Sequence, residues 1–523
     1  MATGSINISS NISRNEMLAI YPPNSCTNFK SSPGEASVFL WWEDPNEPYV
    51  TTDSLVVEWS YTRIVRKIGQ YPSNENDGSI VTESSVKNQY KDNPYIDNNL
   101  LNDVTYYYAA FTCSTSGVFN RKQIITQATP KHFKIMTVTI DLNKSNPATC
   151  GSYADDAKGM ESGKTESATT MWKEFFGYRP CLFKDGKVVG YLNPNDYTKF
   201  EDGKTADITS GNSGDVMVEF PRHGLRISKS GKVVTVSMTD NPNNPEFKYY
   251  AHQRGQINKD FFYVGAYFGS IDDNVNNTRP RLRSVSGASP YTPDTFKWSE
   301  TATPLISNPI NNYGILSFYQ WTYIQAMYIL QFRGNLNSQT ALGYGSCFNA
   351  SWWHDTGVTN DKGMTYGITE KGNNPEENTV KLFGIEDIWG HKRVILNNVY
   401  TCGKKPTLYA TTDDTIDDLT MYTNCGDLLN TNGTSYIQGY MNDCIGTSDG
   451  GFAPTKCSGS SSTYFCDYGM IYRSYDAEDK FAFTVGGDCG DTDKCGIFYT
   501  GVIDKTGIGS NTDSKYVFRL QYL

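Results

Sequence analysis

Residues 384–391 have the sequence GIEDIWGH, and this stretch decides how the second half of the chain is interpreted. Gly384 and Gly390 bracket an apolar and acidic run that ends in Trp389, and the β-rich residues 393–396 follow. Glycine is needed where a backbone turns sharply or approaches another closely, and a tryptophan beside it can fill the space left open. From these residues alone we predict a strand–turn–strand corner with Trp389 in the core.

Length and composition indicate a folded, multidomain chain. Its 523 residues suffice for about three or four domains. A hydrophobic content of 38% and an aromatic content of 13%, with 36 tyrosines, argue against a disordered chain. Short β-branched and aromatic runs alternate with Gly, Asn, Asp, Ser and Thr, which is typical of loop-rich β proteins. We therefore expect a mostly β architecture.

The charge balance indicates which classes of partner the chain can bind. Lys and Arg number 46 against 56 Asp and Glu, which gives a net charge of −10. Residues 401–523 contain 9 basic and 16 acidic residues, so −7 of this charge lies in the last quarter. An acidic surface repels phosphate backbones, so we expect no binding of nucleic acid by electrostatics alone. The sequence has no phosphate loop and no Gly-rich dinucleotide loop, and we predict no cofactor.

The opening residues and the cysteines indicate the compartment. Residues 1–17 lack the basic start and apolar core of a secretory signal, and the longest apolar run, 324–330, is too short and polar to span a bilayer. We expect folding in a cytoplasm and no membrane insertion. Seven of the 12 cysteines fall in the C-terminal region, and no C-x-x-C zinc spacing occurs. Free thiols are expected there, and disulfides remain an alternative outside a cell.

Three parts follow one another along the chain. Residues 1–24 are polar and predict an extended N-terminal arm, either a disordered terminus or a tether. Residues 25–130 show short strands separated by turn residues, which predicts a β-sandwich. These strands are expected at residues 36–42, 55–59, 62–67, 79–81 and 104–111. The remainder, 131–523, is expected to be one large α+β unit with insertions.

Within 131–523 one helix is expected over residues 317–334, because apolar residues recur there at spacings of three and four and Gly334 can cap its end. Residues 143–170 are polar and predict a loop or a short helix. In residues 213–221, alternate side chains predict a strand with Val216 on one face and Met217 on the other. The closing strand, 516–523, is expected to pair with the first strand of this unit.

Two families resemble this chain. The run through Gly390 resembles the G-x-E-(N/D)-x-(W/Y)-G-N-x-W-E-W signature of C-type-lectin-like domains related to formylglycine-generating enzyme. Bacteriophage tail and fibre proteins carry many such domains, as do the variable proteins of diversity-generating retroelements. The match ends where His391 replaces Asn and residues 393–395 replace W-E-W, which leaves the binding members of the family as the better comparison. Residues 25–130 resemble a fibronectin type III module, with Gly-x3-Val-x-Leu-x-Trp over residues 34–42.

The resemblance implies a virion structural protein of a tailed bacteriophage, made in the cytoplasm of the bacterial host. It would be a tail or fibre protein for host adhesion, with a fibronectin type III spacer and a C-type-lectin-like head. Its expected partners are other virion proteins, a glycan or protein receptor on the bacterial surface and further copies of itself. The alternatives are a capsid-decorating or head-fibre protein and, more distantly, a cysteine-oxidising enzyme of the formylglycine-generating type.

The candidate ligand surface lies in residues 423–500, which are rich in Tyr, Ser, Gly, Asn and Asp. Rigid aromatic residues among small polar ones are typical of antibody-like binding surfaces. The alternative is ordinary loop sequence in a tyrosine-rich protein. The candidate ligand-binding residues are Tyr436, Tyr464, Tyr472 and Tyr475.

No catalytic or metal-binding residue is predicted. Cys489 and Cys495 are the nearest candidates for a catalytic cysteine pair, but the surrounding aspartates raise thiol pKa values, and a structural pair is favoured. The five histidines are scattered without a His-x3-His spacing, and His354, in the run WWHD, is expected in a packed aromatic turn. The calcium-dependent sugar-binding motifs Glu-Pro-Asn, Gln-Pro-Asp and Trp-Asn-Asp are missing from the sequence.

Overall fold

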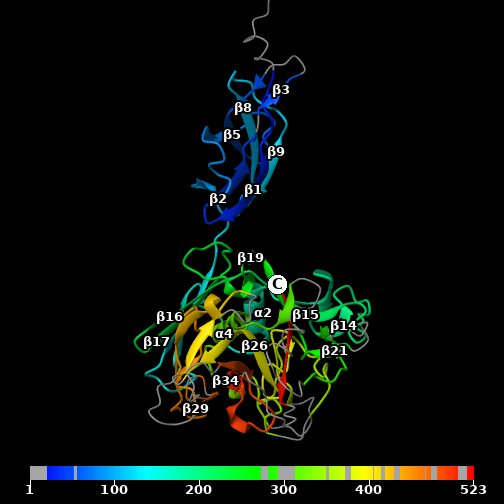
Figure 1. Cartoon of the computed structure of the whole chain (residues 1–523), viewed down its shortest axis with the longest axis vertical. Helices are drawn as coiled ribbons and strands as arrows, with labels where there is room; N and C mark the ends of the chain where they lie inside the picture. Colours follow the sequence, from blue (N-terminus) through cyan, green and yellow to red (C-terminus); the bar gives the residue numbers. More distant parts are fainter. Residues whose placement is uncertain are drawn as a thin grey trace, which may run out of the picture. The chain divides into compact units, whose positions relative to one another are not determined.

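The protein is a mostly β, multidomain chain that divides into two compact units, Met1–Phe133 (unit 1) and Lys134–Leu523 (unit 2), as Figure 1 shows. The computed structural model describes residues 21–46, 48–51, 56–272, 281–292, 312–348, 353–370, 378–403, 406–413, 419–428, 436–463, 465, 467–472, 480–504 and 515–523. Each unit has its own hydrophobic core, so each is described by itself.

Unit 1 is a sandwich of two antiparallel sheets. One sheet has three strands, in the order β1 (Thr27–Gly34), β2 (Ser37–Glu43) and β7 (Tyr95–Asn98). The other has four, in the order β6 (Ser79–Ser84), β5 (Trp59–Ile68), β8 (Tyr106–Ser114) and β9 (Ile124–Ala128). Strands β3 (Tyr49–Val50) and β4 (Val56–Val57) form a short hairpin. Trp42 fills the core between the sheets, and its Nε1 donates to Asp44 Oδ1 at 3.1 Å.

Three large sheets build unit 2. The four-stranded sheet has the order β11 (Gly151–Asp155), β10 (Ile135–Asp141), β17 (Val233–Thr239), β16 (Gly224–Ser230). The seven-stranded sheet has the order β14 (Asp196–Phe200), β13 (Lys187–Asn193), β12 (Arg179–Lys184), β15 (Asp215–Pro221), β20 (Phe261–Gly265), β36 (Leu520–Tyr522), β23 (Tyr313–Ile315). The eight-stranded sheet has the order β28 (Thr423–Asp427), β27 (Thr407–Ala410), β26 (Arg393–Cys402), β33 (Lys480–Gly486), β34 (Gly496–Asp504), β32 (Tyr468–Tyr472), β29 (Tyr436–Tyr440), and β35 (Tyr516–Val517) adds to β26 in parallel.

Among the described residues, unit 2 also contains four short hairpins and single helical turns. The hairpins pair β18 (Gln253–Arg254) with β19 (Ile257–Asn258), β21 (Ser270–Asp272) with β22 (Arg281–Arg283), β24 (Lys381–Leu382) with β25 (Ile385–Glu386), and β30 (Asp443–Cys444) with β31 (Pro454–Lys456). A four-residue helix, α5, spans Ser338–Ala341, and 3-10 turns span Tyr250–His252, Leu419–Met421 and Thr492–Lys494.

Helix α4 (Phe318–Gln331) lies at the centre of unit 2 (Figure 1). It begins with a capping box, in which Ser317 Oγ accepts from the Gln320 backbone N–H and Gln320 Oε1 accepts from the Ser317 N–H. All its side chains are buried, because β10, β17, β26 and helix α2 contact it from different sides. The expected helix is confirmed, but it ends at Gln331, and Phe332 rather than Gly334 forms the C-cap.

A second helix, α2 (Glu166–Phe176), extends beyond the short helix or loop that was expected in residues 143–170. Thr165 caps its start by accepting from the Ala168 N–H, and Gly177 ends it in the left-handed conformation with φ of 66°. Its buried face carries Trp172 and Phe176, whose rings stack at 5.3 Å. Because the first turn of α2 is polar, the hydrophobic pattern of the sequence does not indicate where the helix begins.

The expected pairing of the first and last strands of this unit is wrong. The first strand, β10, pairs with β11 and β17, whereas the last, β36, lies between β20 and β23 in another sheet. The alternation in residues 213–221 is confirmed, with one difference. Because β15 is a central strand, both faces are buried: Val216 packs in the main core and Met217 in a second core on the other side.

The stretch at residues 384–391 forms the strand–turn–strand corner that the sequence predicts. Leu382 pairs with Ile385, so Phe383 and Gly384 make a two-residue turn with φ of 51° and 83°. Trp389 is fully buried, and its Nε1 donates to Gly343 O at 3.0 Å. At Gly390, with φ of 86°, an added Cβ would lie 2.7 Å from the Tyr344 carbonyl oxygen. The backbones meet so closely there that only glycine fits.

Candidate functional site

A cluster of buried charged and titratable residues surrounds the β24–β25 hairpin. Its members come from the hairpin, from the residues just after it and from the end of the chain. They are Lys381, Glu386, Asp387, His391, Lys392 and Arg519, each at most 4% exposed. Charged side chains are almost never so deeply buried unless they are paired, so each one requires a partner.

Glu386 and Lys381 fasten the loop at residues 356–362 to the hairpin. The Glu386 carboxylate accepts from the Gly357 N–H at 2.7 Å, the Thr359 N–H at 2.8 Å and the Thr359 hydroxyl at 2.6 Å. Lys381 Nζ donates to Thr359 O at 2.9 Å and Lys362 O at 3.3 Å. Burial lowers the pKa of Lys381 to about 8, although the Glu386 carboxylate opposes this shift. Both groups hold the loop and have the geometry of structural residues.

Asp387 is surrounded by cationic and imidazole groups. Arg519 donates to Glu386 O at 2.8 Å and to Asp387 O at 3.3 Å, which brings its positive charge beside the carboxylate. Burial favours the neutral acid, but His354, His391 and Arg519 together lower the pKa of Asp387 below its usual value. The Arg519 guanidinium and the two imidazole groups therefore favour the anionic form of Asp387 in the interior.

Two histidines and Asp387 come together behind the hairpin. His391 Nδ1 lies 3.1 Å from Asp387 Oδ2, and His354 Nε2 lies 3.7 Å from Asp387 Oδ1. The two imidazole rings stack, with centroids 4.2 Å apart and an interplanar angle of 25°. The centroids of the Trp353 and His391 rings lie 6.0 Å apart, and Lys392 Nζ lies 3.4 Å from the centroid of the Trp353 ring. We call His354, Asp387 and His391 the His–Asp–His cluster.

Sequence reasoning missed the His–Asp–His cluster. His354 and His391 are far apart in the sequence, and no ligand spacing links them. The expected packed aromatic turn describes only part of the arrangement, because Trp353 is 42% exposed while His354 turns inward against His391. The WWHD run, with a histidine beside two tryptophans and an aspartate, was the only signal.

Cys489 and Cys495 lie close to this cluster but are protonated thiols. They are 3% and 0% exposed, and the Cys489 N–H donates to His391 O at 3.0 Å. Burial, and next the Asp488 carboxylate, raises the pKa of Cys489 to about 11. Burial together with the neighbouring Cys347 thiol raises the pKa of Cys495 well above its usual value. A catalytic cysteine needs the opposite setting, partly exposed and electropositive.

The predicted ligand tyrosines are only partly covered by the described residues. Tyr436 on β29 pairs in register with Tyr472 on β32, so their backbones face each other across the end of the eight-stranded sheet. The side chains of these two residues, and all of Tyr464 and Tyr475, lie outside the described residues. The structure therefore pairs the backbones of Tyr436 and Tyr472 on neighbouring strands.

The same two strands carry a second tyrosine pair. Tyr440 and Tyr468 are half-buried and meet edge to face, with ring centroids 5.3 Å apart and an angle of 89°. Lys494 Nζ lies 5.0 Å from the centroid of the Tyr468 ring. Aromatic pairs of this geometry hold both rings in place.

Beside this pair, residues 458–463 form an exposed serine-rich loop that is internally hydrogen-bonded. The Asn442 amide both donates to Ser458 Oγ at 3.1 Å and accepts from the Ser458 N–H at 3.1 Å. The Ser460 N–H donates to Thr463 Oγ1 at 3.0 Å, and the Gly459 N–H donates to Tyr440 O at 2.9 Å. We call Tyr440, Tyr468, Asn442 and residues 458–463 the Tyr/Ser surface.

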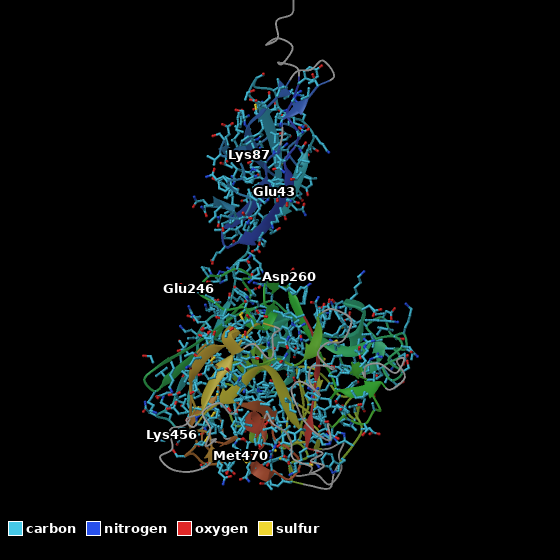
Figure 2. All side chains as sticks on the ribbon, in the orientation of Figure 1. Glu43, Lys87, Glu246, Asp260, Lys456 and Met470 are labelled. Carbon is cyan, nitrogen blue, oxygen red and sulfur yellow. The ribbon has the colours of Figure 1, made fainter. Side chains whose placement is uncertain are left out.

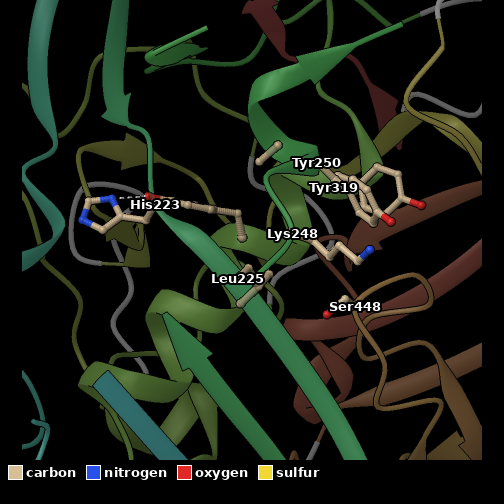
Figure 3. Close-up of a pocket in the computed structure, with 8 residues that line it drawn as sticks. His223, Leu225, Lys248, Tyr250, Tyr319 and Ser448 are labelled. Atoms are coloured by element: carbon tan, nitrogen blue, oxygen red, sulfur yellow. Dashed lines mark hydrogen bonds between the residues drawn. The ribbon is translucent and has the colours of Figure 1, made fainter. Parts of the chain in front are cut away.

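A pocket lined in part by side chains of α4 is too small for a ligand. It is a cavity of about 10 Å³, roughly the space of one water molecule. Figure 3 draws its lining residues and labels Tyr250 and Tyr319, whose rings lie 4.7 Å apart. His223 at its wall is fixed, because its Nε2 lies 3.0 Å from Phe175 O and its Nδ1 lies 3.0 Å from the Tyr323 hydroxyl. We assign this pocket to packing.

Within the described residues, no helix is both long and apolar enough to cross a membrane. The chain matches no protein-family model, and a search of curated proteins finds no significant match. The fold and the contacts described above are therefore what a functional assignment has to rest on.

Proposed function

We propose that this chain is a virion structural protein of a tailed bacteriophage that attaches the particle to a receptor on the bacterial surface. In this proposal unit 1 is a spacer, and unit 2 carries the receptor site on its Tyr/Ser surface. The action is binding without chemistry. The observation that carries the proposal is the position of the Tyr/Ser surface within unit 2.

The chain enters unit 2 at one end, and the Tyr/Ser surface lies at the other. At the entry, the Lys134 N–H donates to Asp240 Oδ1 at 2.8 Å. Figure 2 shows Glu246 and Asp260 at this end of the unit, and Lys456 and Met470, from β31 and β32 beside the Tyr/Ser surface, at the opposite end. An adhesion protein needs this separation, because its attachment to the particle must not cover the receptor site.

The chemistry of the surface supports binding to a neutral polar ligand. Tyrosine offers a large contact area with few rotatable bonds, and serine, asparagine and glycine adapt their hydrogen bonds to the ligand. The internal hydrogen bonds of residues 458–463 restrict the loop before it binds, which lowers the entropy lost in the complex. A glycan, with its hydroxyl groups and apolar ring faces, has matching chemistry.

The test measures adsorption of assembled particles to host cells. Tyr440→Ala and Tyr468→Ala, made singly, should each weaken receptor binding by about 2 kcal/mol, roughly 30-fold, if they anchor the ligand. Single alanine variants of the predicted Tyr436, Tyr464, Tyr472 and Tyr475 belong in the same series. Because few cations are available to pair with an anionic polymer, adsorption should change little between low and high salt.

The matched control is the tyrosine pair Tyr71 and Tyr107 in unit 1, which also meets edge to face at 4.9 Å and 88°. Alanine variants there should leave adsorption unchanged. If all particles assemble, remain stable and adsorb normally with every variant of the Tyr/Ser surface, this surface is not the receptor site. The capsid-decorating role would then be the better proposal.

A further inference from the structure

We propose that Cys347 and Cys495 form a disulfide bond when the chain is in an oxidising medium. Both residues are free thiols in the structure, and both side chains are 0% exposed. The bond joins the loop after α5 to the start of β34, two segments that are far apart in the sequence, and locks the folded form of unit 2. This inference does not depend on the proposed adhesion function.

Backbone hydrogen bonds hold the two cysteine-bearing segments side by side. The Cys347 carbonyl oxygen accepts from the Gly490 N–H at 3.0 Å and from the Thr492 N–H at 2.8 Å, both in the turn that leads into β34. Gln339 Nε2, on the neighbouring helix α5, donates to Cys495 O at 2.8 Å. The approach of the two segments is therefore fixed by the fold before any covalent bond forms.

The two thiols face each other across this contact. Among the side chains, the Cys347 thiol acts most strongly on the Cys495 thiol, through a hydrogen bond and through charge. A Cβ added at Gly487 would lie 2.7 Å from Cys495 Sγ, so this sulfur lies beneath the backbone of the turn and not on its outer side. Two sulfur atoms in hydrogen-bond contact need to approach by roughly 2 Å to reach the S–S bond length of about 2.05 Å.

Cys489 has different neighbours, although it is nearer to Cys495 in the sequence. Its N–H donates to His391 O at 3.0 Å, and its thiol is influenced by Asp488 and Lys392. The sequence favours a structural pair of Cys489 and Cys495, whereas the contacts of Cys495 favour Cys347. We therefore assign the bond to Cys347.

The turn that carries Cys495 is strained, and a covalent bond would hold it in place. Thr492 has φ of 54°, a left-handed conformation that a β-branched residue seldom adopts, and its N–H is bound by Cys347 O. Lys494 in the same turn lies 5.0 Å from the Tyr468 ring of the Tyr/Ser surface. The bond also closes a loop of about 150 residues, and a long closed loop constrains the unfolded chain more than a short one.

Thiol–disulfide exchange with an external disulfide, such as oxidised glutathione, balances the reaction. One cysteine thiolate attacks the external disulfide, forms a mixed disulfide and releases one glutathione thiolate; the second cysteine then attacks the mixed disulfide and releases the other. The two cysteines lose two electrons and two protons, and oxidised glutathione becomes two thiols. Because both sulfurs are buried and burial raises the pKa of Cys495, the turn has to open first, which makes exchange slow in the folded protein.

The alternative is that both cysteines remain thiols and pack as small apolar side chains. A reducing cytoplasm keeps them in this form, so the bond is expected only in an oxidising medium. The two alternatives give different covalent products there, and mass spectrometry distinguishes them.

The experiment equilibrates the full-length protein in glutathione buffers that range from reducing to oxidising. One sample starts from the native protein and a second is refolded from urea in the same buffer, so slow access to the buried sulfurs does not decide the result. Remaining thiols are alkylated and the peptides are mapped by mass spectrometry. We expect a linked pair that contains Cys347 and Cys495, with Cys489 alkylated. The melting temperature of unit 2 should rise by about 5–10 °C on oxidation and fall again with a reducing agent.

Cys347→Ala and Cys495→Ala, made singly, should each abolish this rise. The matched control is Cys489→Ala, a buried cysteine in the same turn, which should keep both the linked pair and the rise. The peptide map of the unsubstituted protein does not depend on how the variants fold. The proposal is overturned if Cys347 and Cys495 are both alkylated in the most oxidising buffer after refolding, or if Cys495 is linked to Cys489 or to any other cysteine.

Discussion

Replacing Trp389 tests whether residues 384–391 hold unit 2 together. The side chain is fully buried, contacts Tyr328 edge to face at 6.2 Å and donates from Nε1 to Gly343 O. Trp389→Ala removes the buried ring, which should lower the unfolding free energy by about 3–5 kcal/mol. It also leaves the Gly343 carbonyl without its donor, which adds about 1–3 kcal/mol. The expected loss of unfolding free energy is therefore roughly 4–8 kcal/mol, comparable to the whole stability of many domains.

Trp389→Phe separates the two contributions. Phenylalanine keeps most of the ring but not the N–H donor, so we expect a loss of about 1–3 kcal/mol. Both variants are measured by urea unfolding and by calorimetry of the full chain, in which the two units should give separate transitions. Trp42→Phe in unit 1 is the control, because Trp42 is also buried and donates from Nε1 to Asp44, and it should shift only the other transition.

A loss of less than about 1 kcal/mol in the unfolding free energy of unit 2 on Trp389→Ala would contradict the burial of this side chain in the core. A variant that stays fully stable but no longer adsorbs to cells would move Trp389 from the core to the binding site.

Three further predictions concern pH, the thiols and the units. Burial lowers the pKa of His252 to about 3, so the unfolded chain takes up this proton first as the pH falls. Stability should drop by roughly 4–5 kcal/mol between pH 6.5 and pH 3, and His252→Gln should remove that part of the pH dependence in unfolding experiments. Combined Cys489→Ser and Cys495→Ser should leave adsorption unchanged apart from any loss of stability, whereas thiol oxidation of a peptide by the parent and not by the variant would indicate an enzyme. Residues 122–132 include β9 of unit 1, so the cleavage site has to follow this strand. Cleavage within residues 129–133 should release two parts that each unfold cooperatively in calorimetry, and failure of both to fold alone would disprove the boundary.

The local features of the fold could be predicted because they depend on residues that are close together in the sequence. Helix α4, the alternation around Val216 and the glycine-bounded corner at Trp389 all depend on residues a few positions apart. Helix α4 shows the limit. Its apolar spacing predicts one buried face, but strands of all three large sheets contact it, and a helix buried on all sides has no solvent face to reveal its orientation.

The candidate sites could not be predicted in the same way, because their residues are far apart in the sequence. His354 reaches His391 because the loop at residues 356–362 is bound to Glu386, and nothing in either local sequence announces that contact. The composition of residues 423–500 identified a tyrosine- and serine-rich region but not which side chains pair. The edge-to-face pair of Tyr440 and Tyr468 follows from the register of β29 and β32, which only the fold supplies.

The position of β36 has a consequence for synthesis on the ribosome. This strand, Leu520–Tyr522, lies between β20 and β23, so the seven-stranded sheet stays in two separate pieces until these residues have emerged. Helix α4 is complete some two hundred residues earlier, which at translation rates of about 5–20 residues per second is roughly 10–40 s. For about the first 70 residues of that interval its apolar surface also lacks partners from β26, which ends at Cys402. The nascent chain therefore has to be kept from aggregating, and a chaperone that binds exposed apolar segments would meet its main target at residues 318–331.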